Sequence, residues 1–291
     1  MNPLEINIVF FHSPCQDGIG AAYVANKFAK ENNLEYLFVG ITNNSKDIET
    51  DITDKNIIFF DYAPTEEQIK TLSSAKAFFI VDHHKTNEER LKNYPNTIFN
   101  LNKSGAGLAW EYFYPDKLMP LFLQMIQDRD LWKWEIPNSK PFCDGLFTYC
   151  VSNTSSNSDV FELFDSINTD NNKFNEILAV GTILEKKKQK KLENIANTVT
   201  KKTYIYDNYK VCIVNCDHEL ASDLGNMILL KYDFDFVVCW RYYHNNEEYW
   251  LSLRANNKVD VSEICKKYGG GGHKNASGCN TKIHPSILFS S

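Results

Sequence analysis

The sequence lacks any excess of positive charge, since 31 lysines and arginines stand against 37 aspartates and glutamates, a net charge of −6. Proteins that bind long duplex nucleic acid neutralise its phosphates with clustered basic side chains. We therefore expect no long duplex as a partner, although a small phosphorylated substrate is compatible with this charge. The sequence also has no apolar run long enough to cross a membrane and no basic region at its N-terminus, so we expect no membrane partner and no signal peptide.

Cysteines are present, but they lack the spacing of a disulfide framework. The eight cysteines are scattered along the chain, and none forms a Cys-x-x-Cys pair. Cys212, Cys239 and Cys265 lie in apolar stretches, which is typical of small core residues. This pattern favours a reduced, cytoplasmic compartment.

Hydrophobic residues make up 43% of the 291 residues, enough for packed cores, and the length favours two domains. In the first half, predicted strands at 6–11, 36–39, 57–61 and 77–82 alternate with predicted helices, which indicates a parallel sheet covered on both faces. A shorter alternation follows from 211 to 268, and segment 152–173 is interpreted as a loop around a short helix.

We predict an α/β fold with a catalytic domain at 1–180, a helical connector at 181–203 and a smaller α/β domain at 204–291. The active site is expected in the cleft between the domains. The lysine run 186–191 on the connector is interpreted as a solvated helix face.

Histidines and acidic residues gather where the predicted elements end. The four clusters are His12 with Cys15 and Asp17 after the first strand, Asp61 after the third, Asp82-His83-His84 after the fourth, and Asp128-Arg129-Asp130 after a helix. Because ligands bind at the carboxyl ends of parallel strands, we expect these clusters to converge. Buried ion pairs and helix caps are the alternative explanation.

Mixed histidine and carboxylate side chains suit Mn²⁺, and Fe²⁺, Co²⁺ or Zn²⁺ are also compatible. Two such ions about 3.5–4 Å apart could activate water and hold a phosphoryl oxygen. The clusters therefore predict a divalent-metal site, most simply with two Mn²⁺ ions.

These motifs, in this order, resemble those of the DHH superfamily of phosphoesterases. Asp82-His83-His84 after an apolar strand resembles the family signature, and Gly269–His273 with the following Lys-Asn-Ala-Ser-Gly278 resembles the glycine-rich motif of the DHH-associated C-terminal domain. The resemblance covers nearly the whole chain. Within the superfamily, the chain resembles the oligoribonuclease or nanoRNase members and the bisphosphate phosphatase members.

The resemblance implies a role for each position. It places His12 and Asp61 on one metal, and Asp17, Asp61, His83 and Asp128 on the other, with Asp61 bridging. Asp130 is the second candidate for the fourth motif. Asp82 would orient a histidine, and His84 would face the substrate phosphate. One position departs from the commoner pattern, because Cys15 stands where an aspartate is usual. Cys15 could be a metal ligand that favours a softer ion, or a bystander beside a weak first site.

The glycine run and Arg254 are the candidates for substrate binding. Gly270, Gly271 and Gly272 could let backbone N–H groups approach an anion, and His273 could add a charged donor. A flexible hinge is the alternative for the glycines, and a surface ion pair is the alternative for Arg254.

The resemblance therefore implies a metal-dependent hydrolase that cleaves phosphodiester or phosphomonoester bonds through a metal-bound hydroxide. We expect short oligonucleotides, dinucleotides or nucleoside bisphosphates as substrates, with a nucleotide or short single strand as the bound partner. A polyphosphatase or pyrophosphatase activity is one alternative, and a non-catalytic nucleotide-binding protein with an impaired metal site is another. The sequence is also compatible with a homodimer.

Overall fold

The computed structural model describes residues 1–42, 45, 47–150, 157–199 and 202–290. Over these residues the chain divides into two compact units. The first comprises Met1–His83 and Asn87–Glu185, and the second comprises His84–Thr86 and Lys186–Ser291. The division at residue 185 falls within the predicted connector 181–203, of which residues 200–201 lie outside the described residues.

The first unit is built on a five-stranded sheet whose pairs are all parallel, in the order β2-β1-β3-β4-β5. The strands are β1 (Ile8–His12), β2 (Leu37–Ile41), β3 (Asn56–Phe60), β4 (Ala77–Asp82) and β5 (Thr97–Phe99). Because β1, β3 and β4 are neighbours and run in the same direction, the residues that follow them lie at one edge of the sheet.

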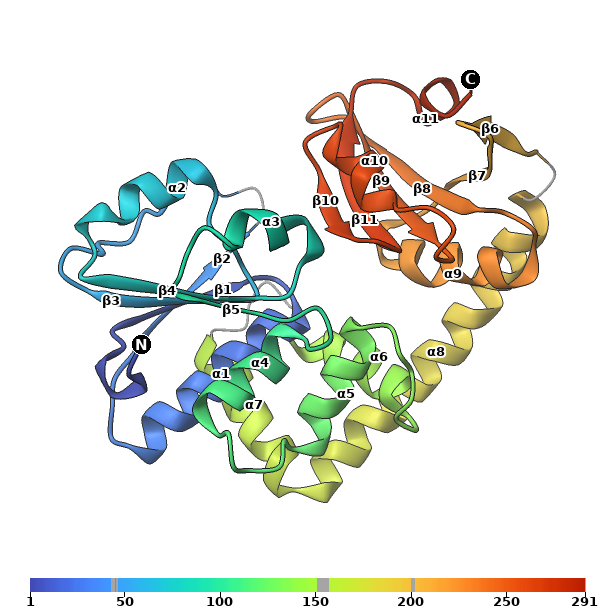
Figure 1. Ribbon diagram of the computed structural model, residues 1–291. Coiled ribbons are helices and arrows are strands. Elements are labelled where there is room, and N and C mark those ends of the chain that lie inside the picture. The colour runs from blue at the N-terminus through green and yellow to red at the C-terminus, as the bar shows by residue number, and fades with distance from the viewer. Residues whose placement is uncertain (43–44, 46, 151–156, 200–201, 291) are drawn as a thin grey trace. The chain divides into compact units, whose positions relative to one another are not determined.

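Helices cover both faces of this sheet (Figure 1). The helices of the first unit are α1 (Gln16–Glu31), α2 (Glu66–Thr71), α3 (Glu88–Leu91), α4 (Gly105–Phe113), α5 (Leu121–Asp130), α6 (Ser139–Cys150), α7 (Asn157–Thr169) and the first part of α8 (Asn171–Val199). On one face Phe11 and Phe60 pack with residues of α1 and α4, and on the other Phe10 and Phe59 pack near Leu72. The strands are therefore apolar on both sides, as the nearly continuous apolar runs predict.

The second unit contains a six-stranded mixed sheet in the order β10-β11-β9-β8-β7-β6. Its strands are β6 (Tyr204–Tyr206), β7 (Tyr209–Asn215), β8 (Phe236–Tyr243), β9 (Glu248–Ala255), β10 (Gly271–His273) and β11 (Ala276–Thr281). The β7–β8 pair is parallel, and α9 (Ala221–Lys231) makes the connection between these two strands. The other pairs are antiparallel.

Two cores stabilise the second sheet, one on each face. One core joins Val214 and Val237 to Leu192 of α8 and Leu224 of α9. The other joins the sheet to α10 (Val261–Lys266) and to Phe289, which follows α11 (Pro285–Leu288). Cys212, Cys239 and Cys265 are buried in these cores, which confirms their interpretation as core residues. The predicted α/β fold with two sheets is confirmed.

Some elements were not predicted, and each has its own physical reason. The strands β5, β6 and β10 have three residues each, too few to show a periodic pattern. Helix α6 contains Pro141 and Gly145, residues of low helix propensity. In segment 152–173, residues 152–156 lie outside the described residues, and α7 is longer than the short helix that we expected.

A search of the described helices finds none that is both long and apolar enough to span a membrane.

Candidate metal centre

The clusters that follow β1, β3 and β4 meet in the first unit. His12 is the last residue of β1, Cys15 precedes the first turn of α1, and Asp17 lies within that turn. Asp61 follows β3 directly, and His83 follows β4. Asp17, Asp61 and His83 are 1%, 2% and 0% exposed, so the site is a buried cluster of charged groups.

Asp61 stands between the two histidines. Its Oδ1 lies 3.1 Å from Nε2 of His83, and its Oδ2 lies 3.5 Å from Nδ1 of His12. The backbone of Asp61 is left-handed, with φ of 57°, a conformation that is uncommon outside glycine and tends to occur at functional sites. The two oxygens of one carboxylate thus face two different histidines.

Among the described residues, two sets of side chains that lie wholly within the first unit have the composition and spacing of metal ligands. The ligand atoms of His12, Cys15 and Asp61 lie within 4.8 Å of one another, and so do those of Asp17, His83 and Asp130. His83 Nε2 lies 3.6 Å from Oδ2 of Asp17 and 3.5 Å from Oδ2 of Asp130. Since His83 Nε2 also lies beside Asp61, that carboxylate links the two sets.

The start of α4 holds the Asp17 carboxylate, which the sequence analysis missed. The backbone N–H of Ala106 donates a hydrogen bond of 2.9 Å to Oδ1 of Asp17, and the N–H of Gly105 donates to Oδ2. A Cβ atom on Gly105 would lie 2.5 Å from Cβ of Asp61, so only glycine fits here. A helix N-terminus favours negative charge, and Ser104 before Gly-Ala-Gly was the sequence signal for this helix start.

The two aspartates of the fourth motif, Asp128-Arg129-Asp130, have different roles. Oδ1 of Asp128 accepts a hydrogen bond of 2.8 Å from the N–H of Glu135, and its Oδ2 accepts one of 2.5 Å from the hydroxyl of Ser139. Asp128 is 4% exposed, and these bonds fix the chain between α5 and α6. The carboxylate beside His83 and Asp17 is that of Asp130, the second candidate for the fourth motif.

The electrostatics of the cluster fit a bound cation. Burial opposes the charge of His12, but hydrogen bonds with Asp61 and Cys15 prevail and raise its pKa to about 11. Burial likewise opposes the charge of His83, and Asp130 and Asp61 outweigh it and raise the pKa of His83. Burial raises the pKa of Asp17, and the charges of Asp130 and Asp61 add to this. Carboxylates that disfavour one another's charge, beside imidazoles, form a donor set that a divalent cation would satisfy.

Asp82 and His84, the other two residues of the Asp-His-His motif, each contact a residue within their own unit. Asp82 is buried at the end of β4 and accepts a hydrogen bond of 2.7 Å from the side-chain amide of Asn87. His84 belongs to the second unit, where its ring stacks on that of His273 with the centroids 5.2 Å apart.

The second half of the glycine run belongs to the second sheet. Gly271–His273 forms β10 and pairs with β11, and a Cβ atom on Gly270 would lie 2.1 Å from the carbonyl oxygen of Gly278. Gly272 has φ of 137°. Close approach and backbone conformation therefore explain these glycines, and their predicted contact with phosphate stays a prediction.

Arg254 is half-buried in the same unit. Its guanidinium donates hydrogen bonds of 2.9 Å to the hydroxyl of Ser252 and 2.8 Å to the carbonyl of Leu253, and another to the hydroxyl of Ser222. Burial lowers the pKa of Arg254. Its predicted contact with substrate stays a prediction.

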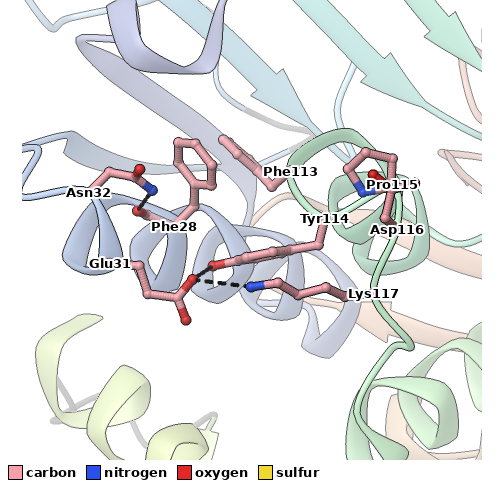
Figure 2. A pocket seen from close by; sticks show the side chains of 8 residues that line it. All are labelled: Phe28, Glu31, Asn32, Phe113, Tyr114, Pro115, Asp116 and Lys117. Atoms are coloured by element: carbon pink, nitrogen blue, oxygen red, sulfur yellow. Dashed lines mark hydrogen bonds and ion pairs between the residues drawn. The ribbon is translucent and has the colours of Figure 1, made fainter.

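A pocket of about 400 Å³ lies in the first unit beside the C-terminal end of α1 and residues 113–117 (Figure 2). Glu31 points toward Tyr114 and Lys117 there, and it accepts a hydrogen bond of 2.8 Å from the Tyr114 hydroxyl. Glu31 also pairs with Lys27 at 2.6 Å. The pocket includes none of the clustered histidines and aspartates, so we assign it no part in their chemistry.

The chain resembles a viral protein along almost its whole length. No protein-family model matches the chain. The "Uncharacterized protein R106" of Acanthamoeba polyphaga mimivirus is 33% identical over 298 residues, an alignment that covers 95% of this chain and 68% of that protein.

Solved structures are similar in fold at lower identity. RecJ of Thermus thermophilus, solved in complex with Mn²⁺, is 13% identical with a TM-score of 0.53, covering 98% of this chain and 50% of RecJ. The pGpG-specific phosphodiesterase PggH of Vibrio cholerae is 15% identical with a TM-score of 0.50, covering 95% of this chain and 94% of PggH. The chain thus shares the fold of these structures and of a solved DHH domain, and it belongs to the family of the mimivirus protein.

Proposed function

We propose that this protein is a metal-dependent phosphoesterase that hydrolyses phosphodiester or phosphomonoester bonds in short nucleotides. The observation that carries this proposal is the pair of ligand sets linked by Asp61, whose two oxygens face His12 and His83. A single bridging carboxylate between two mixed sets suits a pair of divalent cations.

We assign His12, Cys15 and Asp61 to one cation. Asp17, Asp61, His83 and Asp130 are assigned to the other, with Asp130 in place of Asp128. When bound, the two cations would supply Lewis-acid polarisation of a phosphoryl oxygen and activation of water. The shared fold with RecJ, whose structure contains Mn²⁺, supports Mn²⁺ as the ion.

The protein's own residues then have separable tasks. The N-terminus of α4 orients Asp17 through the N–H groups of Gly105 and Ala106, so that its oxygens are fixed before the cation binds. The fixed backbone of Asp61 directs its two oxygens to different partners. In the second unit, His84, Arg254 and the segment Gly270–His273 would bind a phosphate remote from the scissile bond.

Short oligonucleotides, dinucleotides and nucleoside bisphosphates are the proposed substrates. The net charge of −6 disfavours long polyanions, because few counterions would be released on binding. The fold that the chain shares with a pGpG-specific phosphodiesterase supports a dinucleotide as the first substrate to test.

The experiment is a hydrolysis panel with Mn²⁺ over dinucleotides, short oligonucleotides, nucleoside bisphosphates and polyphosphate. We expect turnover of at least one nucleotide substrate, its loss on chelation and its return with Mn²⁺. Asp130→Asn should abolish turnover, and Asp116→Asn, at an exposed aspartate outside the cluster, is the matched control. Undiminished turnover after exhaustive chelation, or no turnover of any phosphate compound, would contradict the proposal.

A further inference from the structure

The chain between α5 and α6 has an unusual backbone. Trp132, Trp134 and Asn138 have φ of 56°, 57° and 67°, all in the left-handed region. Asparagine tolerates this region, but for a bulky side chain such as tryptophan it is unfavourable and persists only where the surroundings fix it. Two tryptophans in this conformation within three residues form a strained segment of the kind that clusters at functional sites and ligand clamps.

Asp128 is the residue that fixes this segment. Its carboxylate accepts hydrogen bonds from the N–H groups of Glu135 and Ile136 and from the hydroxyl of Ser139. Its carbonyl accepts a further hydrogen bond of 2.9 Å from the N–H of Lys133. A buried side chain thus organises the turn around both tryptophans.

The two tryptophan side chains contact each other edge to face, with the ring centroids 4.9 Å apart. Both are half-buried. Among the described residues, Ile136 of the same segment packs against the hydrophobic core of the first unit, but Trp132 and Trp134 are not among the side chains that do so. Both residues are therefore partly open to solvent, and tryptophan is enriched at binding interfaces.

The position of this surface links it to the candidate metal centre. Trp132 follows Asp130 by two residues, and Oδ2 of Asp130 lies 3.5 Å from Nε2 of His83. The ammonium group of Lys140 lies 5.4 Å from the centre of the Trp134 ring. An aromatic surface with a positive charge at its margin thus lies close in sequence to a proposed metal ligand, within the same unit.

We propose that Trp132 and Trp134 form a stacking surface for a nucleobase of the substrate. Bases stack on aromatic side chains with little regard to sequence, whereas pyrophosphate and polyphosphate offer nothing to stack. This inference deepens the proposed function and rests on it, because it names the part of the substrate that the site recognises beside the phosphate. With this stacking surface, the candidate metal centre would act on nucleotides and not on inorganic phosphates.

The test compares two ligands that differ only in the base. AMP and ribose 5-phosphate are titrated into the full-length, Mn²⁺-loaded protein by calorimetry. We expect the unaltered protein to bind AMP at least tenfold more tightly, and Trp132→Leu with Trp134→Leu to bring the two affinities within about threefold. Trp132→Phe should keep most of the preference, and Lys133→Ala, at an exposed position between the tryptophans, should keep all of it. A double leucine variant that keeps the preference overturns the inference.

A second measurement needs no variant and so does not depend on how the leucine protein folds. In protein loaded with diamagnetic Zn²⁺, because paramagnetic Mn²⁺ would broaden the signals, stacking on indole shifts the base protons H2 and H8 of bound AMP upfield in proton NMR, and unshifted protons in the bound state overturn the inference. Both measurements read binding and not turnover. A protein that shows the base preference but hydrolyses nothing in the panel contradicts the proposed function alone, and one that hydrolyses nucleotides without the preference contradicts the stacking surface alone.

Discussion

The backbone N–H of Glu135 donates a hydrogen bond of 2.8 Å to Oδ1 of Asp128. Because Oδ2 of the same carboxylate is engaged by Ser139 and Ile136, Asp128 organises a turn, although it stands in a motif that resembles a metal ligand. Asp130, two residues later, lies beside His83 and Asp17. Two acidic residues in one tripeptide thus have separate tasks, and they can be tested separately.

We expect Asp128→Asn to lower the free energy of unfolding of the metal-free protein by about 1.5–3 kcal/mol, because an amide group cannot accept all three hydrogen bonds at a buried site. Asp130→Asn should leave that free energy nearly unchanged but weaken Mn²⁺ binding by tenfold or more. Urea denaturation and calorimetric titration with Mn²⁺ measure the two effects. The opposite pattern would restore Asp128 as the ligand.

A second prediction concerns Asp61. Asparagine tolerates left-handed backbone, so Asp61→Asn should keep the fold while removing a charged oxygen from between His12 and His83. We expect it to reduce both the bound Mn²⁺ stoichiometry and kcat/KM more than His12→Ala does, with a loss of at least a hundredfold in kcat/KM. Elemental analysis and steady-state kinetics provide the measurement. If the folded variant kept both ions and near-normal turnover, Asp61 would not bridge them.

The pH dependence of metal binding follows from the raised pKa values. In the metal-free protein, hydrogen bonds with Asp61 and Cys15 overcome burial and raise the pKa of His12 from 6.5 to about 11, and burial with neighbouring carboxylates raises the pKa of Asp17. A raised histidine pKa stabilises the fold fully below about pH 6.5, and this stabilisation is lost as the pH rises toward 11. A raised aspartate pKa destabilises the fold increasingly as the pH rises above the ordinary aspartate value of 3.8 toward the raised pKa of Asp17. Metal-free protein should therefore become less stable from pH 6 to pH 8.5.

Mn²⁺ must displace protons from the same ligands, so its affinity should increase over this pH range. One displaced proton corresponds to about 1.4 kcal/mol per pH unit, so the difference in Tm between loaded and metal-free protein should widen by several degrees. Thermal denaturation with and without excess Mn²⁺ at the two pH values measures it, with His12→Gln as the variant that should reduce the widening. A constant difference in Tm would show that no proton is displaced on binding.

Cys15 supplies a further prediction, because its sulfur belongs to the ligand set with His12 and Asp61. Thiolate favours softer ions, so Cys15→Ser should weaken Zn²⁺ binding more than Mn²⁺ binding, and Cys15→Asp should shift the preference toward Mn²⁺. Competition titrations with the two ions measure the preference. If neither variant changed stoichiometry or preference, Cys15 would be a bystander.

The sequence by itself determined the architecture of the first unit and the location of its chemistry. Apolar runs that alternate with amphipathic helices specify a parallel sheet covered on both faces, and β1, β3 and β4 formed where those runs predicted them. Once these strands are parallel neighbours, the residues after them must lie at one edge. His12, Asp61 and His83 could therefore be brought together by topology alone, before any side-chain contact was known.

Only the tertiary structure decided which neighbouring side chains take part. Asp128 and Asp130 are chemically identical and two residues apart, and they differ because a turn formed by residues 131–138 engages one carboxylate and leaves the other beside His83. The hydrogen bond from the N–H of Gly105, at the start of α4, to the carboxylate of Asp17 joins residues that are 88 positions apart in the sequence. No local sequence pattern encodes such a contact. The left-handed backbone of Asp61 likewise accompanies a contact across the sheet, since its N–H donates a hydrogen bond to the carbonyl of Val81. Trp132 and Trp134 have the same backbone conformation within the turn that Asp128 organises, although the local preference of tryptophan is for other conformations.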